Sequence, residues 1–106
     1  MRTLLFAAVL TMFGGAVAAW ANQLTVSQAN TSFSIESLTV KPGDTVVFEN
    51  KDSKTHNIQI VSADGSVDDK GLQKPGQDVK ATLNAAGEYK VRCAIHPKMK
   101  MVITVK

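Results

Sequence analysis

From residue 22 onward, apolar and polar residues alternate along short stretches of the chain. A period of two places every second side chain on one face of a strand and is typical of strands with one buried side. Turn-forming segments, such as residues 41–44 and 84–87, separate these stretches at short intervals. We therefore predict an all-β sandwich or barrel. The expected strands are residues 24–28, 37–40, 45–50, 56–61, 78–83, 88–94 and 101–106.

The longest connection between the expected strands is the segment 62–77, which is rich in Gly, Asp and Lys. It shows no alternation of apolar and polar residues, so we expect an irregular loop with room for a short helix. No side chain in this segment belongs to a recognisable catalytic or metal-binding pattern. We therefore expect it to take no part in a functional site.

The first 21 residues have the features of a secretory signal peptide. Arg2 gives a positive start, residues 4–12 form an apolar run, and Ala19-Trp20-Ala21 is a small-x-small cleavage sequence. A membrane anchor is the alternative, but the apolar run is shorter than the ~20 residues that a spanning helix needs. We expect cleavage after Ala21, with cleavage after Ala18 as the alternative.

Cleavage after Ala21 leaves residues 22–106, which is enough chain for a single domain. The whole sequence is 44% apolar and 20% charged, as in a globular protein, and its formal net charge is +3. That charge is small for a dedicated nucleic-acid binder. We expect a monomeric exported domain with no nucleic-acid partner and no membrane insertion after the signal peptide is removed.

Cys93 is the single cysteine, so no internal disulfide stabilises this small exported domain. The alternation in the neighbouring strands places Cys93 near the end of one strand, and His56 at the start of another, on the buried face. A thiol and an imidazole at positions that are otherwise apolar need a partner. A metal ion would satisfy both groups.

The segment that begins at Cys93 has the pattern Cys-x2-His-x2-Met, which adds His96 and Met99 as candidate ligands. Together with His56, these residues offer a thiolate, two imidazoles and a thioether, the soft donor set of a blue copper site. Zinc is a weaker alternative because structural zinc sites favour Cys and His and seldom use methionine. A domain without a metal, with a core cysteine and incidental histidines, is the remaining alternative.

Met99 and Met101 are both candidates for the fourth ligand. Met101 alternates in step with Ile103 and Val105, which indicates that it is the first core residue of the last strand. Only five residues would follow a ligand at position 101. We therefore favour Met99.

The sequence resembles the cupredoxins, the small blue copper proteins that include plastocyanin, pseudoazurin and amicyanin. The similar segments are residues 40–50, which lead to the first ligand, the pair His56-Asn57, and residues 86–93 before the copper loop. The short His-Pro-x-Met loop is most like that of amicyanin. The resemblance implies a Greek-key β-sandwich of about seven to eight strands. It also implies one type 1 copper ion held by His56, Cys93, His96 and Met99.

Three positions depart from the family pattern. Ala94 and Ile95 stand where cupredoxins often have a Ser or Thr and a Pro, which puts a hydrogen bond from Asn57 to this loop in question. Arg92 stands where plastocyanins have a Tyr that is associated with a second electron-exchange surface. We expect that second route to be absent.

The resemblance implies one-electron transfer between larger redox proteins in the periplasm, with His96 as the point of electron entry and exit. Four protein ligands leave no open position for a substrate, so we do not expect an enzyme. Lys98 and Lys100, with Lys90 and Arg92 nearby, favour a partner with an acidic docking surface. Amicyanin-like proteins imply a methylamine dehydrogenase as donor and a c-type cytochrome as acceptor. A periplasmic copper carrier or buffer is the alternative function.

Overall fold

The computed structural model describes residues 21–106, so the expected signal peptide lies outside the described residues except for Ala21. Nine strands make up the described part of the chain. They are β2 (Gln23–Ala29), β3 (Ser32–Phe33), β4 (Ser37–Val40), β5 (Asp44–Asn50), β6 (His56–Val61), β7 (Val67–Gln73), β8 (Asp78–Leu83), β9 (Gly87–Cys93) and β10 (His96–Val105). Within residues 21–106, no helix has the length and apolar character needed to cross a membrane.

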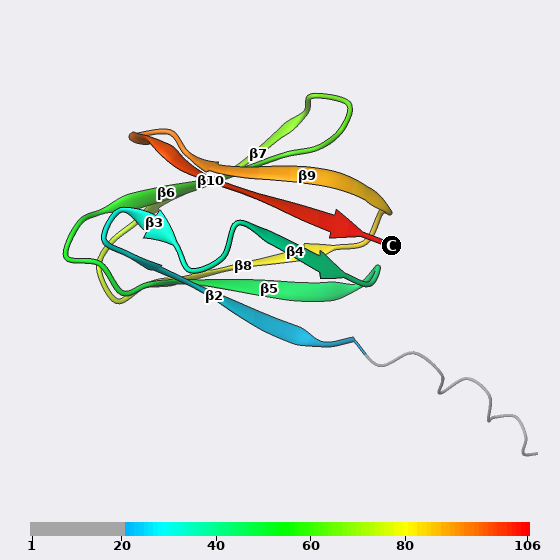
Figure 1. The fold of residues 1–106 in the computed structure, drawn as a ribbon, viewed down its shortest axis with the longest axis horizontal. Coiled ribbons are helices and arrows are strands. Elements are labelled where there is room, and N and C mark those ends of the chain that lie inside the picture. Colours follow the sequence, from blue (N-terminus) through cyan, green and yellow to red (C-terminus); the bar gives the residue numbers. More distant parts are fainter. Residues whose placement is uncertain (1–20) are drawn as a thin grey trace, which may run out of the picture.

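The strands form two sheets that pack face to face as a sandwich (Figure 1). One sheet has the order β4-β10-β9-β6-β7, and the other has the order β3-β2-β5-β8. Most neighbours are antiparallel, while β10 with β4 and β2 with β5 run parallel. The all-β fold expected from the alternation and the Greek-key sandwich implied by the resemblance are therefore confirmed, and the fold is a sandwich, not a closed barrel.

The core lies between the two sheets and is built from the side chains that the alternation predicted to face inward. Phe48 of β5 is fully buried and is met from the other sheet by Ile58 of β6, Val91 of β9 and Ile103 of β10. The alternation in β9 and β10 leaves the charged side chains on the outer face. Burying such apolar side chains is the main favourable contribution to folding.

Three strands differ from the expectations, and the first is β3, a two-residue strand at a place where no strand was predicted. The segment 62–77 contains β7 instead of an irregular loop or a short helix. Six of the seven residues of β7 are exposed, because β7 is an edge strand held by backbone pairing to β6, so its side chains show no apolar alternation. The last strand, β10, begins at His96, five residues before the predicted start at Met101.

Several loops gather at the end of the sandwich opposite to the C-terminus (Figure 1). The turn between β9 and β10, the loop between β5 and β6, and the turn between β2 and β3 all lie there. This end of the sandwich brings together residues that are far apart in the sequence. Three of the candidate ligands lie here, at the ends of strands.

Candidate metal centre

Three candidate ligands lie at adjacent strand ends. His56 is the first residue of β6, Cys93 is the last residue of β9, and His96 is the first residue of β10. Because β6 and β9 are antiparallel neighbours, the start of one lies beside the end of the other. A tight turn then returns the chain, so that His96 pairs with Cys93. The topology therefore brings together the three residues that the sequence indicated.

Their donor atoms form a compact triangle. Nδ1 of His56 lies 3.0 Å from Nδ1 of His96, while Sγ of Cys93 lies 3.9 Å from the first nitrogen and 3.6 Å from the second. The point equidistant from three atoms with these separations lies about 2 Å from each, close to the length of metal–imidazole and metal–thiolate bonds. The triangle therefore has the size that a first-row transition metal requires.

The three side chains differ in their access to solvent. His56 and Cys93 are buried, with 0% and 1% of their surface exposed, whereas His96 is half-buried. Ile95 is 50% exposed beside His96, and Pro97 on its other side is also exposed. His96 is thus the edge of the centre that reaches the molecular surface, and we call the two exposed apolar residues that flank it, Ile95 and Pro97, the apolar rim.

Met99 lies in the irregular first part of β10, three residues after His96. His96 pairs with Cys93 and Lys100 pairs with Arg92, so the register shifts and the segment 97–99 bulges out of the ladder. Met99 is nevertheless 1% exposed, although both of its sequence neighbours are exposed. The bulge therefore turns a buried thioether toward the interior at the metal-binding end.

Met101 has a different environment. It pairs with Val91 in the regular part of the ladder and belongs to the main apolar core with Ile103. Met99 is buried but does not belong to that core cluster. The contrast agrees with the preference for Met99 as the fourth ligand.

Asn57 connects β6 to the loop that carries the cysteine and the second histidine. Its backbone N–H donates to Sγ of Cys93 at 3.2 Å, and its side-chain oxygen accepts the backbone N–H of Ala94 at 3.1 Å. The hydrogen bond that Ala94 and Ile95 put in question is therefore present. It is made to the backbone, so it needs no hydroxyl side chain at position 94.

The side chain of Asn57 is held from the other side by β7. Its Nδ2 donates to Oδ1 of Asp69 and to the carbonyl oxygen of Gly71, both at 2.9 Å. Hydrogen bonds from Gln59, the Gly71 N–H and Asn57 lower the pKa of Asp69. The expectation that the segment 62–77 takes no part in the site is thus wrong. No pattern in the sequence links Asp69 to Asn57, because the contact depends on the pairing of β7 with β6.

A carboxylate lies against the far side of the His56 ring. Oδ2 of Asp52 is 2.9 Å from Nε2 of His56, and the same oxygen accepts the backbone N–H of Thr31 at 2.9 Å. The bond from Thr31, together with that from His56, lowers the pKa of Asp52 to about 2. No motif of the sequence includes Asp52, although an acidic residue four positions before a candidate ligand is a usable signal.

The donor chemistry and the geometry agree on the kind of metal. A thiolate, two imidazole nitrogens and a nearby thioether form the donor set of a trigonal blue copper site with a weak axial methionine. The donor triangle made by His56, Cys93 and His96 has room for one ion at bonding distance from all three. The residues present therefore fit a single copper ion.

Comparison with known proteins gives the same assignment. The family model for copper-binding proteins of the plastocyanin/azurin family matches residues 20–106. The methylamine utilization protein MauL of Methylorubrum extorquens is 29% identical over 105 residues, a match that covers 99% of this chain and 92% of that protein. The MauL of Methylophilus methylotrophus is 33% identical over 67 residues, which cover 61% of this chain but only 38% of that protein.

Solved structures agree as well. The structure of a reduced variant of amicyanin superposes with a TM-score of 0.74 at 27% sequence identity, and the match covers 86% of this chain and 89% of that one. The cofactor of this chain is one type 1 copper ion, and the protein carries electrons and is not an enzyme. From its sequence, its fold and its donor set, the chain belongs to the plastocyanin/azurin family of copper-binding proteins, the cupredoxins, and is similar to amicyanin.

Proposed function

We propose that His56, Cys93, His96 and Met99 hold the copper, and that the protein carries single electrons between larger redox proteins in the periplasm. The observation that carries this proposal is the triangle formed by Nδ1 of His56, Sγ of Cys93 and Nδ1 of His96. Bound copper supplies the one-electron couple between Cu(I) and Cu(II). The Met99 thioether would supply the fourth donor of the set.

The chain keeps the donors in place while the charge of the centre changes. His56, Cys93 and His96 stand on three neighbouring strands of one sheet. Asn57 holds the cysteine sulfur and the following turn through two hydrogen bonds. Donors that are fixed by the ladder rearrange little on oxidation and reduction, and a small rearrangement permits fast electron transfer.

His96 is the proposed route for the electron. It is the only ligand of the donor triangle that reaches the surface, and the exposed side chains of Ile95 and Pro97 flank it. A partner that packs on this apolar rim comes close to the centre without opening it. The His56 ring and the Cys93 sulfur behind the rim are buried and so are closed to solvent.

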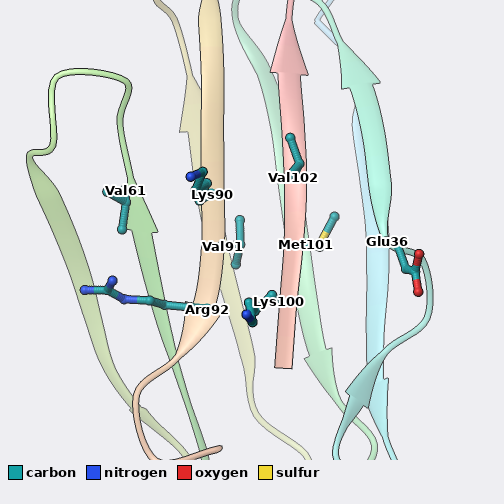
Figure 2. Close-up of a pocket in the computed structure, with 8 residues that line it drawn as sticks. All are labelled: Glu36, Val61, Lys90, Val91, Arg92, Lys100, Met101 and Val102. Atoms are coloured by element: carbon teal, nitrogen blue, oxygen red, sulfur yellow. The ribbon is translucent and has the colours of Figure 1, made fainter. Parts of the chain in front are cut away.

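A cationic groove lies on the outer face of the five-stranded sheet (Figure 2). Lys90, Arg92 and Lys100 project from β9 and β10 around the apolar side chains of Val61 and Val102, and Glu36 is the one acidic residue in the lining. Lys100 lies directly opposite Arg92 in the ladder, and like charges in this position are unfavourable. Within residues 21–106, none of the three cations forms an ion pair with a carboxylate.

The cationic groove continues toward the metal-binding end. A second hollow shares Arg92 and Lys100 with it and extends to Cys93, Ala94 and Pro97. Exposed Lys98 adds a further positive charge beside Pro97. We infer that the redox partner presents an acidic surface to these cations, which attract it and orient it over His96.

The location and the partners form part of the same proposal. The signal-peptide features of residues 1–21 support export to the periplasm and cleavage after Ala21. The similarity to a protein named for methylamine utilization supports a methylamine dehydrogenase as the electron donor and a c-type cytochrome as the acceptor. We propose that the mature chain works as a monomer.

The decisive experiment adds Cu(II) to the purified mature protein and records its visible spectrum. We expect one equivalent of copper to produce an intense band at about 600 nm, which arises from charge transfer from a copper-bound thiolate. Cys93→Ala removes the band. Val91→Ala is the matched control, because Val91 is a fully buried residue on the same face of β9 but offers no donor. An equally blue Cys93→Ala protein would refute the proposed ligand set.

A further inference from the structure

One carboxylate in the described part of the chain contacts a proposed copper ligand. Oδ2 of Asp52 lies 2.9 Å from Nε2 of His56, and the two side chains are 8% and 0% exposed. Among residues 21–106, no other charged side chain forms a hydrogen bond with His56, Cys93 or His96. This buried contact bears on which ring nitrogen of His56 carries the proton.

An ionised carboxylate accepts hydrogen bonds and does not donate them, so the proton between the two groups belongs to Nε2 of His56. The neutral imidazole then has its free lone pair on Nδ1. Nδ1 is the atom that lies 3.0 Å from His96 and 3.9 Å from Cys93. Asp52 therefore favours the ring tautomer in which the nitrogen that faces the centre is ready to bind a metal.

Asp52 is itself held firmly in the ionised form. Oδ2 accepts the Thr31 N–H at 2.9 Å, Oδ1 accepts the Ser53 N–H at 2.8 Å, and the Asp52 N–H donates to Oδ1 of Asn50 at 2.9 Å. Thr31 has a positive φ of 56° in the turn between β2 and β3, a conformation that aims its N–H at the carboxylate. The hydrogen bonds of Asp52 thus connect the turn of the four-stranded sheet to the first ligand on the other sheet.

We propose that Asp52 is a positioning residue that sets the tautomer of His56 and lowers the reduction potential of the bound copper. A hydrogen bond from the ligand ring to a carboxylate raises the basicity of the ring, and the negative charge favours the more positive oxidation state. Asp52 thereby stabilises Cu(II) more than Cu(I). This inference rests on the proposed function, in which His56 is a ligand.

The potential test uses Asp52→Asn, which keeps the shape and a side-chain oxygen but removes the charge. We expect the ratio of Cu(II) affinity to Cu(I) affinity to fall about tenfold, which raises the potential of a one-electron couple by about 59 mV. Asp52→Glu keeps the charge and should give a potential closer to that of the parent protein. A potential of Asp52→Asn equal to the parent value would overturn the electrostatic part of the proposal.

The matched control is Asp44→Asn. Asp44 also accepts two backbone N–H groups, from Asn22 at 2.9 Å and from Lys41 at 2.8 Å, but it lies at the start of β5, away from the ligands. Asp44→Asn should therefore lower the stability and leave the potential unchanged. A rise in potential as large as that of Asp52→Asn would show a general effect of net charge and would overturn the specific role.

The tautomer is measured without metal, from the nitrogen-15 chemical shifts of the two histidine rings in the apoprotein. We expect His56 to carry its proton on Nε2 in the parent protein and to become a mixture of tautomers in Asp52→Ala. An unchanged tautomer in Asp52→Ala would overturn the positioning part. Because the apoprotein contains no copper, this result separates a failure of the Asp52 proposal from a failure of the copper site, which the loss of colour in Cys93→Ala tests.

Discussion

The side-chain oxygen of Asn57 accepts the backbone N–H of Ala94 at 3.1 Å and so joins β6 to the turn between Cys93 and His96. The partner is a main-chain group, so the contact survives the absence of a hydroxyl side chain at position 94. Asn57 itself is 5% exposed and is held by Asp69 and Gly71 from β7. An edge strand with exposed side chains thereby orients a residue that contacts the cysteine sulfur.

Asn57→Leu should destabilise the apoprotein by about 1–3 kcal/mol, because the Ala94 N–H and the Gly71 carbonyl oxygen lose a buried partner. Urea unfolding monitored by circular dichroism measures the loss. Gln59→Leu is the control, since Gln59 also donates to Asp69 but lies in a more exposed position and does not touch the turn. Equal losses in both variants would contradict the role of Asn57 in holding the turn.

Replacement of the two methionines separates the axial ligand from the core residue. Met99→Leu should keep the copper and its colour but raise the reduction potential, because loss of a weak electron donor disfavours Cu(II). Met101→Leu should leave the potential unchanged and cost less than about 1.5 kcal/mol of stability, as a near volume-conserving change in the core. Cyclic voltammetry and urea unfolding measure the two effects. The reverse pattern of potentials would assign the axial position to Met101.

Charge reversal at the docking surface should slow partner association. With Lys98 and Lys100 replaced by Glu, we expect a lower bimolecular electron-transfer rate at low salt, measured by stopped-flow with an acidic c-type cytochrome. The parent and variant rates should converge as ionic strength rises, because at 0.1–0.15 M charges further apart than about 8–10 Å are largely screened. The copper spectrum should stay unchanged.

A variant with Lys80 and Lys106 replaced by Glu is the control for this experiment. Both residues are exposed, and they lie on β8 of the other sheet and after the end of β10, away from the copper loop. The control makes the same change in net charge but should slow the reaction less. If the electron-transfer rate changes neither with salt nor with charge reversal, docking depends on the apolar rim of Ile95 and Pro97 alone.

Asp44 should make the stability of the fold depend on acid pH. Backbone hydrogen bonds from Asn22 and then Lys41 lower its pKa from 3.8. A lowered pKa in the folded state means that the contribution to stability is complete above the unfolded value and is lost as the pH falls through the folded one. Asp44→Asn should therefore cost more stability at pH 6 than at pH 2, measured by urea unfolding. An equal cost at both values would show that the charge of Asp44 contributes nothing.

The same contact predicts that the two alternative cleavage sites give mature chains of different stability. The Asn22 nitrogen lies 2.9 Å from Oδ1 of Asp44, so in a chain that starts at Asn22 this nitrogen is a charged α-amine. Charge-assisted hydrogen bonds are stronger than those of a neutral amide. We expect a chain that starts at Asn22 to be more stable at pH 6 than one that starts at Ala19, and high salt should reduce the difference. If the two chains are equally stable, the charged Asn22 α-amine does not form a stabilising ion pair with Asp44.

The sequence by itself determined the strands that have one buried side, because their alternation is a local property that one stretch of chain displays alone. It also determined the spacing of Cys93, His96 and Met99, which share one loop, and the inward position of His56. These features sufficed to predict an all-β sandwich or barrel and a candidate donor set. Resemblance to the cupredoxins then pointed to type 1 copper.

Only the tertiary structure showed how the ligands are supported. β7 escaped prediction because its stability comes from backbone pairing with β6, which leaves no apolar pattern in its side chains. Asp69 contacts Asn57 only because β7 pairs with β6, and the Thr31 N–H that holds Asp52 comes from a separate turn. A local pattern carries no information about such contacts between residues remote in the chain. Asp52 itself stands only four residues before His56, so the tertiary structure decided the orientation of its carboxylate and not its proximity.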